Sequence, residues 1–94
     1  MGKIQKQLLI SGRVQGVGFR HFTKQNARGL GVNGWVKNLR NGDVEAVLEG
    51  EEEQVDELEN RLKSGPVAAK VKSVDVVKIE NVTEESFKYF SVKR

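Results

Sequence analysis

Cysteine is absent from the sequence, and histidine, proline and tryptophan each occur once. The lack of cysteine excludes a disulfide framework, a thiolate metal site and a cysteine nucleophile. With His21 as the only imidazole, we see no cluster of histidine and carboxylate side chains that predicts a metal site. The first residues lack the apolar core of a signal peptide, and no later apolar run approaches membrane-spanning length, so we expect a cytoplasmic protein without a membrane segment.

Length and composition indicate a single small domain over residues 1–94. The chain has 37% hydrophobic and 31% charged residues, as in ordinary globular proteins. Sixteen Lys and Arg against thirteen Asp and Glu give a formal charge of +3. This mild excess is compatible with an anionic small molecule, with nucleic acid or with no charged partner at all.

Hydrophobic periodicity predicts the order β α β β α β, followed by a short extra strand. At Asn41–Gly42 we predict a type I′ hairpin turn, in which both central residues need a positive φ. The central residues 8–10 of the first strand are apolar on both faces, which is typical of an interior strand in a covered sheet. The predicted strands are residues 3–14, 32–39, 44–49, 71–79 and 87–92, and the predicted helices are residues 19–30 and 51–63.

This order favours an α+β fold, a ferredoxin-like βαββαβ sandwich with an antiparallel sheet and two helices on one face. The strand register near Asn41–Gly42 is left open by the sequence. A slip of one residue would move Asn38 to the other face of the sheet.

The loop between the first strand and the first helix is predicted to bind an anion. Gly16 and Gly18 allow positive φ, so successive N–H groups of the loop from Gln15 to Phe19 can converge on one oxyanion at the helix N-terminus. Arg20 lies in the first helical turn, where a cation opposes the helix dipole. Its position therefore indicates a role in binding an anion, not in stabilising the helix. A glycine pair before a helix is weak evidence alone, because tight turns also need glycine.

Nucleotide binding is disfavoured by the same loop. The loop lacks the GxxxxGK[ST] pattern of a phosphate-binding loop, and no GxGxxG is followed by a ribose-binding acid. Side chains for catalysis are scarce as well. His21 is displaced by about 100° from Arg20 on the helix. Asn38 is the remaining candidate, because its amide can hold a water without ionising, although a solvent-facing role near the hairpin stays open.

The motifs GRVQGVGFR (residues 12–20), GWVKN (34–38) and NGDVE (41–45), together with Gly65–Pro66 and the stretch after it, closely resemble the acylphosphatase family. The resemblance covers nearly the whole chain, and the motifs occur in the family's order. It implies the ferredoxin-like fold already predicted from the element order.

By this resemblance, Arg20 corresponds to the substrate-binding arginine and Asn38 to the asparagine that positions the attacking water. The backbone amides of Gln15, Gly16, Val17, Gly18 and Phe19 correspond to the phosphate-binding loop. The implied reaction is the hydrolysis of an acyl phosphate to a carboxylate and inorganic phosphate, without a metal or cofactor. Inorganic phosphate and similar anions are then expected to bind as product or inhibitor.

Two departures from the family pattern lie beside these positions. Gly18 stands where some members carry a bulkier aromatic residue, and Leu39 follows Asn38 where some carry threonine. Related domains also occur inside large hydrogenase-maturation proteins, but we expect here a stand-alone, monomeric enzyme.

Two other functions compete with this interpretation. A ferredoxin-like sheet can bind RNA, but RNA recognition needs solvent-facing aromatic residues on a central strand, and residues 44–49 contain none, so we expect no nucleic-acid binding. A catalytically silent phosphate or metabolite sensor would use the same loop, and only an activity assay separates it from an enzyme.

Overall fold

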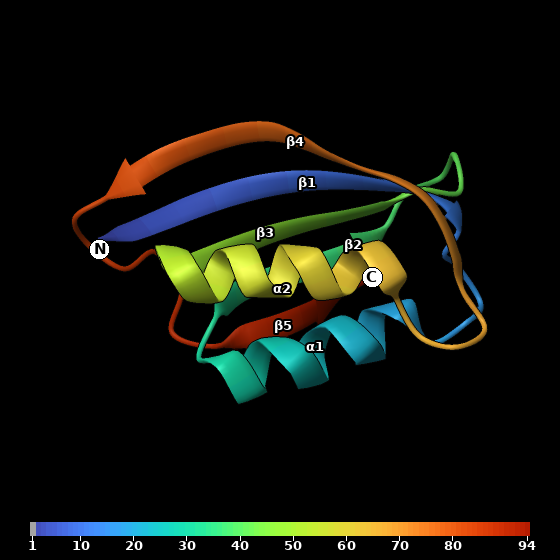
Figure 1. Ribbon diagram of the computed structural model, residues 1–94, viewed down its shortest axis with the longest axis horizontal. Helices are drawn as coiled ribbons and strands as arrows, with labels where there is room; N and C mark the ends of the chain where they lie inside the picture. The colour runs from blue at the N-terminus through green and yellow to red at the C-terminus, as the bar shows by residue number, and fades with distance from the viewer. Residues whose placement is uncertain (1) are drawn as a thin grey trace.

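The computed structural model describes residues 2–94 and contains five strands and two helices (Figure 1). The elements are β1 (Lys3–Arg13), α1 (Phe19–Leu30), β2 (Asn33–Asn38), β3 (Val44–Glu51), α2 (Glu52–Ser64), β4 (Lys70–Val82) and β5 (Phe90–Lys93).

The strands form one sheet in the order β4-β1-β3-β2-β5, and both helices run along the same side of it (Figure 1). β1 pairs antiparallel with β3 and β4, and β2 pairs antiparallel with β3. The predicted ferredoxin-like sandwich is therefore confirmed. One pairing adds to the expected antiparallel pattern, because the short β5 runs parallel to β2 at the sheet edge.

The hydrophobic core lies between the helices and the sheet. Ile4, Leu8 and Ile10 alternate along β1 toward the helices and are buried. α2 buries Val55, Leu58 and Leu62, whose spacing of three and four residues places them on one face of the helix. As its apolar centre predicts, β1 is an interior strand, between β4 and β3. Within residues 2–94 it is covered on one face only, and the intervening Leu9 is half-buried. In the described chain the helices cover one face of the sheet, so every second residue of β1 lies on the open face.

The β2–β3 turn differs from the predicted type I′ hairpin. Among residues 2–94 only glycines have positive φ, so Asn41 cannot take the left-handed conformation that a type I′ turn requires, whereas Gly42 has φ 97°. The Gly42 N–H donates to Leu39 O, and the Leu39 N–H donates to Asp43 O at 2.8 Å. This pattern is a three-residue loop that ends in a glycine bulge.

β5 is shorter than the predicted strand of residues 87–92, and a buried carboxylate binds the segment that precedes it. The N–H groups of Ser86 and Phe87 donate to Glu49 Oε1 at 2.8 and 3.1 Å, so they do not enter the sheet ladder. Burial alone would raise the pKa of Glu49, but hydrogen bonds from the Gln5 side chain and these two N–H groups outweigh it and lower the pKa. Glu49 thereby fixes the segment that leads into β5.

A buried lysine joins β1 to α2. Lys6 Nζ contacts Asp56 at 2.7 Å and Glu59 at 2.6 Å on the helix side of the sheet. Burial alone would lower the pKa of Lys6, but its hydrogen bonds to both carboxylates outweigh this and raise the pKa. Because the charge is paired twice, it is tolerated at the border of the core.

Gly34 sets how closely β2 approaches β3, and replacing it is expected to destabilise the fold. Its φ is 136°, and a Cβ on Gly34 would lie 1.8 Å from Val47 O. Gly34→Ala should therefore lower the free energy of unfolding by at least about 3 kcal/mol, measured by urea denaturation. Gly29→Ala is the matched control, since a Cβ there meets no atom within 4 Å, and inside α1 it should stabilise by about 0.5–1 kcal/mol. Equal stability of both variants would contradict this role of Gly34.

Candidate active site

The loop before α1 has the conformation of an anion-binding nest. Gly16 and Gly18 adopt φ values of 73° and 79°, and a Cβ at either position would meet only open space. Gly18 caps α1 without a side-chain hydrogen bond, and the first turn of the helix holds no acid. The first N–H groups of α1 therefore lack a side-chain acceptor and can bind an anion.

Apolar residues on either side of the glycines hold this loop in place. Val14 and Phe19 are buried, and Val17 packs against the core between the two glycines. Alternation of apolar anchors with glycines fixes the loop at three points while the backbone between them remains accessible. The sequence therefore builds a rigid cradle from residues that supply no charge of their own.

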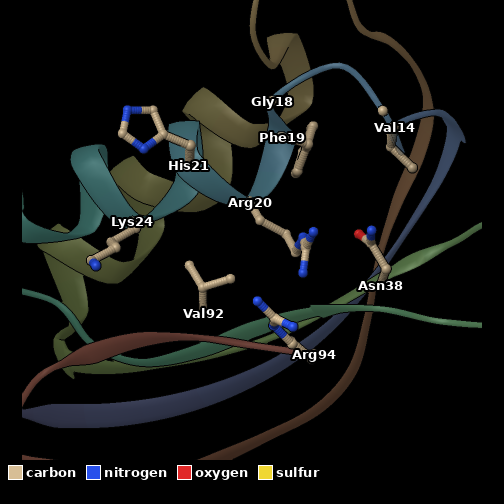
Figure 2. A pocket seen from close by; sticks show the side chains of 10 residues that line it. Val14, Gly18, Phe19, Arg20, His21, Lys24, Asn38, Val92 and Arg94 are labelled. Atoms are coloured by element: carbon tan, nitrogen blue, oxygen red, sulfur yellow. The ribbon is translucent and has the colours of Figure 1, made fainter.

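Arg20 extends from the first turn of α1 toward the end of β2 (Figure 2). Its Nη1 donates a hydrogen bond to Lys93 O at 3.1 Å, so β5 orients the guanidinium. A guanidinium carries five N–H donors, and one hydrogen bond to a carbonyl leaves the others for a ligand. Arg20 can therefore be held in place and bind two oxygens of an anion at once.

Asn38 ends β2 on the helix side of the sheet, which answers the register question that the sequence left open. It pairs with Val44 and lies two residues beyond the buried Val36, so both side chains share one face. Figure 2 shows the amide of Asn38 and the guanidinium of Arg20 pointing toward each other. Asn38 Oδ1 is buried, and no hydrogen-bond partner for it exists among residues 2–94.

Arg20 and Asn38 line the same cavity, which has a volume of about 450 Å³. Three cationic side chains and His21 border it, and no carboxylate side chain among the described residues does. The electrostatic potential of this cavity favours an anion with more than one negative charge. The lining residues are Val14, Gly16, Gly18, Phe19, Arg20, His21, Lys24, Asn38, Val92 and Arg94.

Sequence reasoning did not identify Arg94, Lys24 or Val92 as neighbours of this site. Lys24 follows Arg20 by four residues, a spacing that does predict a shared helix face, but it does not indicate that this face borders the cavity. Arg94 and Val92 reach the cavity because β5 pairs parallel with β2, and no local pattern in residues 90–93 indicates this pairing. The ring of His21 points away from Arg20 and Asn38, in agreement with the helical spacing (Figure 2).

Gln15 has a second function in addition to its place in the loop. Its Nε2 donates to Leu39 O at 2.7 Å and to Asp43 O at 2.9 Å. Both acceptors belong to the turn that directly follows Asn38. The side chain of Gln15 therefore joins the anion-binding loop to the β2–β3 turn, and this link fixes the position of Asn38 relative to the loop.

Comparison with known proteins places this site in a family. The family model described as Acylphosphatase matches residues 6–92. The chain is 49% identical over 79 residues to an acylphosphatase of Methanothrix thermoacetophila, which covers 84% of this chain and 88% of the relative. It is 45% identical over 93 residues to an acylphosphatase of Syntrophotalea carbinolica, with 99% of both chains covered.

A solved structure leads to the same assignment. The crystal structure of acylphosphatase from Bacillus subtilis superimposes with a TM-score of 0.87 at 33% identity, covering 97% of this chain and 99% of that one. A ferredoxin-like enzyme with an anion-binding loop is thus the class that fold and site define. The chain belongs to the acylphosphatase family. The resemblance seen in its motifs is confirmed.

Removing the Gln15 link is expected to slow turnover more than it weakens phosphate binding. Gln15→Ala deletes two hydrogen bonds, which should lower the free energy of unfolding by about 1–3 kcal/mol. Because Asn38 then loses its fixed position, we expect kcat to fall about 10- to 100-fold. Inhibition by inorganic phosphate should change less than kcat. Gln25→Ala, on the exposed side of α1, is the control, and an unchanged kcat in Gln15→Ala would overturn this role.

Proposed function

We propose that this acylphosphatase hydrolyses carboxyl-phosphate mixed anhydrides by direct attack of water on phosphorus. The loop amides of residues 15–19 and Arg20 bind the phosphate, and Asn38 holds the water. The P–O bond to the acyl group breaks, and its electron pair leaves with the carboxylate. Water supplies the new P–O bond and releases its proton to solvent or to the products.

The features of the cavity support binding of a dianion. Positive-φ glycines and the uncapped start of α1 present N–H donors, and Arg20 and Arg94 add positive charge from two sides (Figure 2). Phosphoryl transfer needs mainly positioning and charge stabilisation. A donor aimed at the developing charge lowers the activation free energy by about 3–4 kcal/mol.

The single observation that carries the proposal is the buried, unpartnered Oδ1 of Asn38 in this cationic cavity. A buried acceptor without a partner costs about 1–3 kcal/mol, so it is retained where a ligand or water uses it. An amide oxygen can accept a hydrogen bond from the attacking water and orient its lone pair toward phosphorus.

The chemistry of the substrate explains why so few side chains suffice. A carboxylate is a stable leaving group at neutral pH, so the acyl oxygen needs no general acid. The phosphorus is activated by the same mixed anhydride, so an oriented water needs no strong base. Orientation alone can lower the activation free energy by about 7–11 kcal/mol.

Further properties remain predictions from the sequence. We expect a cytoplasmic monomer that does not bind nucleic acid. No helix of residues 2–94 is long and apolar enough to cross a membrane. Trp35 is aromatic and lies on β2, but both Lys37 and Lys93 already occupy positions over its ring, at 5.4 and 4.3 Å. This arrangement leaves little of the ring for stacking with a base.

Substitutions of Asn38 and Arg20 should separate catalysis from binding. Asn38→Ala should lower kcat for benzoyl phosphate hydrolysis about 10²-fold or more, while inorganic phosphate inhibits almost as in the parent. Arg20→Ala should lower kcat about 10²- to 10³-fold and also weaken phosphate inhibition. Steady-state kinetics with phosphate as inhibitor measures both.

Asn60→Ala, an exposed amide on α2, is the control for Asn38→Ala. Arg20→Lys tests the fork geometry, because lysine keeps the charge but cannot bind two oxygens in one plane. Full turnover in Asn38→Ala would rule out its role. Binding of phosphate without any hydrolysis by the parent protein would favour the sensor instead.

Turnover is expected to be independent of divalent metal ions. No group of three or more His, Cys, Asp or Glu residues that could hold a metal exists within residues 2–94, and the cavity presents cations where a metal-phosphate site presents carboxylates. The initial rate of benzoyl phosphate hydrolysis should be the same after treatment with a chelator and after addition of Mg²⁺. A rate that falls with the chelator and returns with Mg²⁺ would contradict the mechanism.

A further inference from the structure

The cavity offers more room than a phosphate needs. Its volume of about 450 Å³ lies in the ~300–1,000 Å³ range of sites that hold whole small molecules. Gly16, Gly18, Arg20 and Asn38 account for the phosphate end. The other polar or apolar lining residues include His21, Lys24, Val92 and Arg94, and Figure 2 shows Lys24 and Val92 on the side away from Asn38. This side of the cavity has to receive the acyl group, since the phosphate and the acyl group are covalently joined.

Lys24 is placed one helical turn beyond Arg20. Residues four apart on a helix share a face and are separated by about 6 Å along its axis. Lys24 is half-buried, and none of the ion pairs among residues 2–94 includes it. Figure 2 shows its side chain farther along α1 than Arg20 and on the side away from Asn38. Lys24 is therefore an uncompensated cation at the far end of the cavity.

Val92 separates the two cationic positions. It belongs to β5, lines the cavity and is 39% exposed. Figure 2 places it below α1, between Lys24 and Arg94. The cavity thus combines a phosphate end, a short apolar wall and a cation. These three parts, in this order, would accommodate an acyl phosphate whose acyl group has a few methylenes and a terminal negative charge.

We propose that Lys24 forms an acyl subsite that selects acyl phosphates carrying a second anionic group, such as the monoacyl phosphates of short dicarboxylic acids. This inference rests on the proposed function and specifies its substrate class. Lys24 lies one helical turn beyond Arg20, so a short acyl chain is expected to reach it, and a four-carbon dicarboxylic acid is the probe of choice. The reaction itself is unchanged, and Lys24 acts only on binding of the acyl group.

The test compares two substrates of equal shape and different charge. Succinyl phosphate carries a terminal carboxylate, and 4-methylpentanoyl phosphate carries an uncharged isopropyl group of the same shape. The ratio of their kcat/KM values measures the preference. We expect the parent protein to prefer succinyl phosphate about two- to fivefold at low salt, the range of a solvent-exposed ion pair. The preference should fall as salt is added, because exposed charges are screened.

Lys24→Gln should abolish this preference, and Lys24→Glu should reverse it. Lys63→Gln is the matched control, because it removes the same charge from an exposed position on α2 outside the cavity, and it should leave the ratio as in the parent. Circular dichroism and thermal unfolding of all variants check that they are folded. A ratio that is unchanged in both Lys24 variants, or a parent protein without any preference, would overturn the proposal.

The same assays separate this proposal from the proposed function. If the parent protein hydrolyses neither substrate nor acetyl phosphate, hydrolysis itself is wrong. If it hydrolyses all three and Lys24→Glu treats the charged and the neutral substrate alike, only the acyl subsite is wrong. If Lys24→Gln lowers kcat/KM for both substrates by one factor, Lys24 acts as general positive potential on the phosphate, and the acyl subsite is again wrong.

Discussion

Positive charge and N–H donors gather at the start of α1 without a side chain of opposite charge to compensate them. An N-cap side chain is worth about 1 kcal/mol, and acids in the first turn add to it. Here Gly18 provides no such side chain, and Arg20 places a cation where the helix dipole disfavours it. Packing of Phe19 in the core must therefore stabilise this end of the helix in place of capping. In the proposed function, the dianionic phosphate group of the substrate supplies the missing negative charge.

Backbone carbonyls accept the hydrogen bonds that hold Arg20 at the cavity and join the loop residue Gln15 to the β2–β3 turn. Arg20 donates to Lys93 O, and Gln15 donates to the carbonyls of Leu39 and Asp43. Any residue supplies a carbonyl, so the identity of these acceptor positions is free to vary. The link between the loop and the turn therefore uses the carbonyl of Leu39 and does not depend on its side chain. The residues that must be kept are instead the two donors, Arg20 and Gln15, together with the strand pairing that positions each carbonyl.

The sequence predicted the parts of this site that depend on local pattern. The glycine loop and the two helices follow from spacing alone, and the motifs identified the family. The pairing of β5 with β2 could not be predicted from local sequence pattern. The parallel contact of β5 with β2 brings Arg94 and Lys93 O to the site, yet residues 90–93 carry no signal for their partner. The turn at Asn41–Gly42 was misassigned because Asn-Gly also suits a loop in which only the glycine has positive φ.

An amide is well suited to hold water beside a phosphate. A carboxylate in the place of Asn38 would repel the dianion, and an imidazole would change its charge near neutral pH. An amide accepts a hydrogen bond without carrying charge, but it cannot attract the water over distance, so its effect depends on position alone. Gly34, which admits close approach to Val47 O, and Gln15, which holds the turn after Asn38, supply this precision. In the proposed mechanism the carboxylate is easily displaced, so catalysis depends less on acid-base groups than on the position of Asn38 at the end of β2.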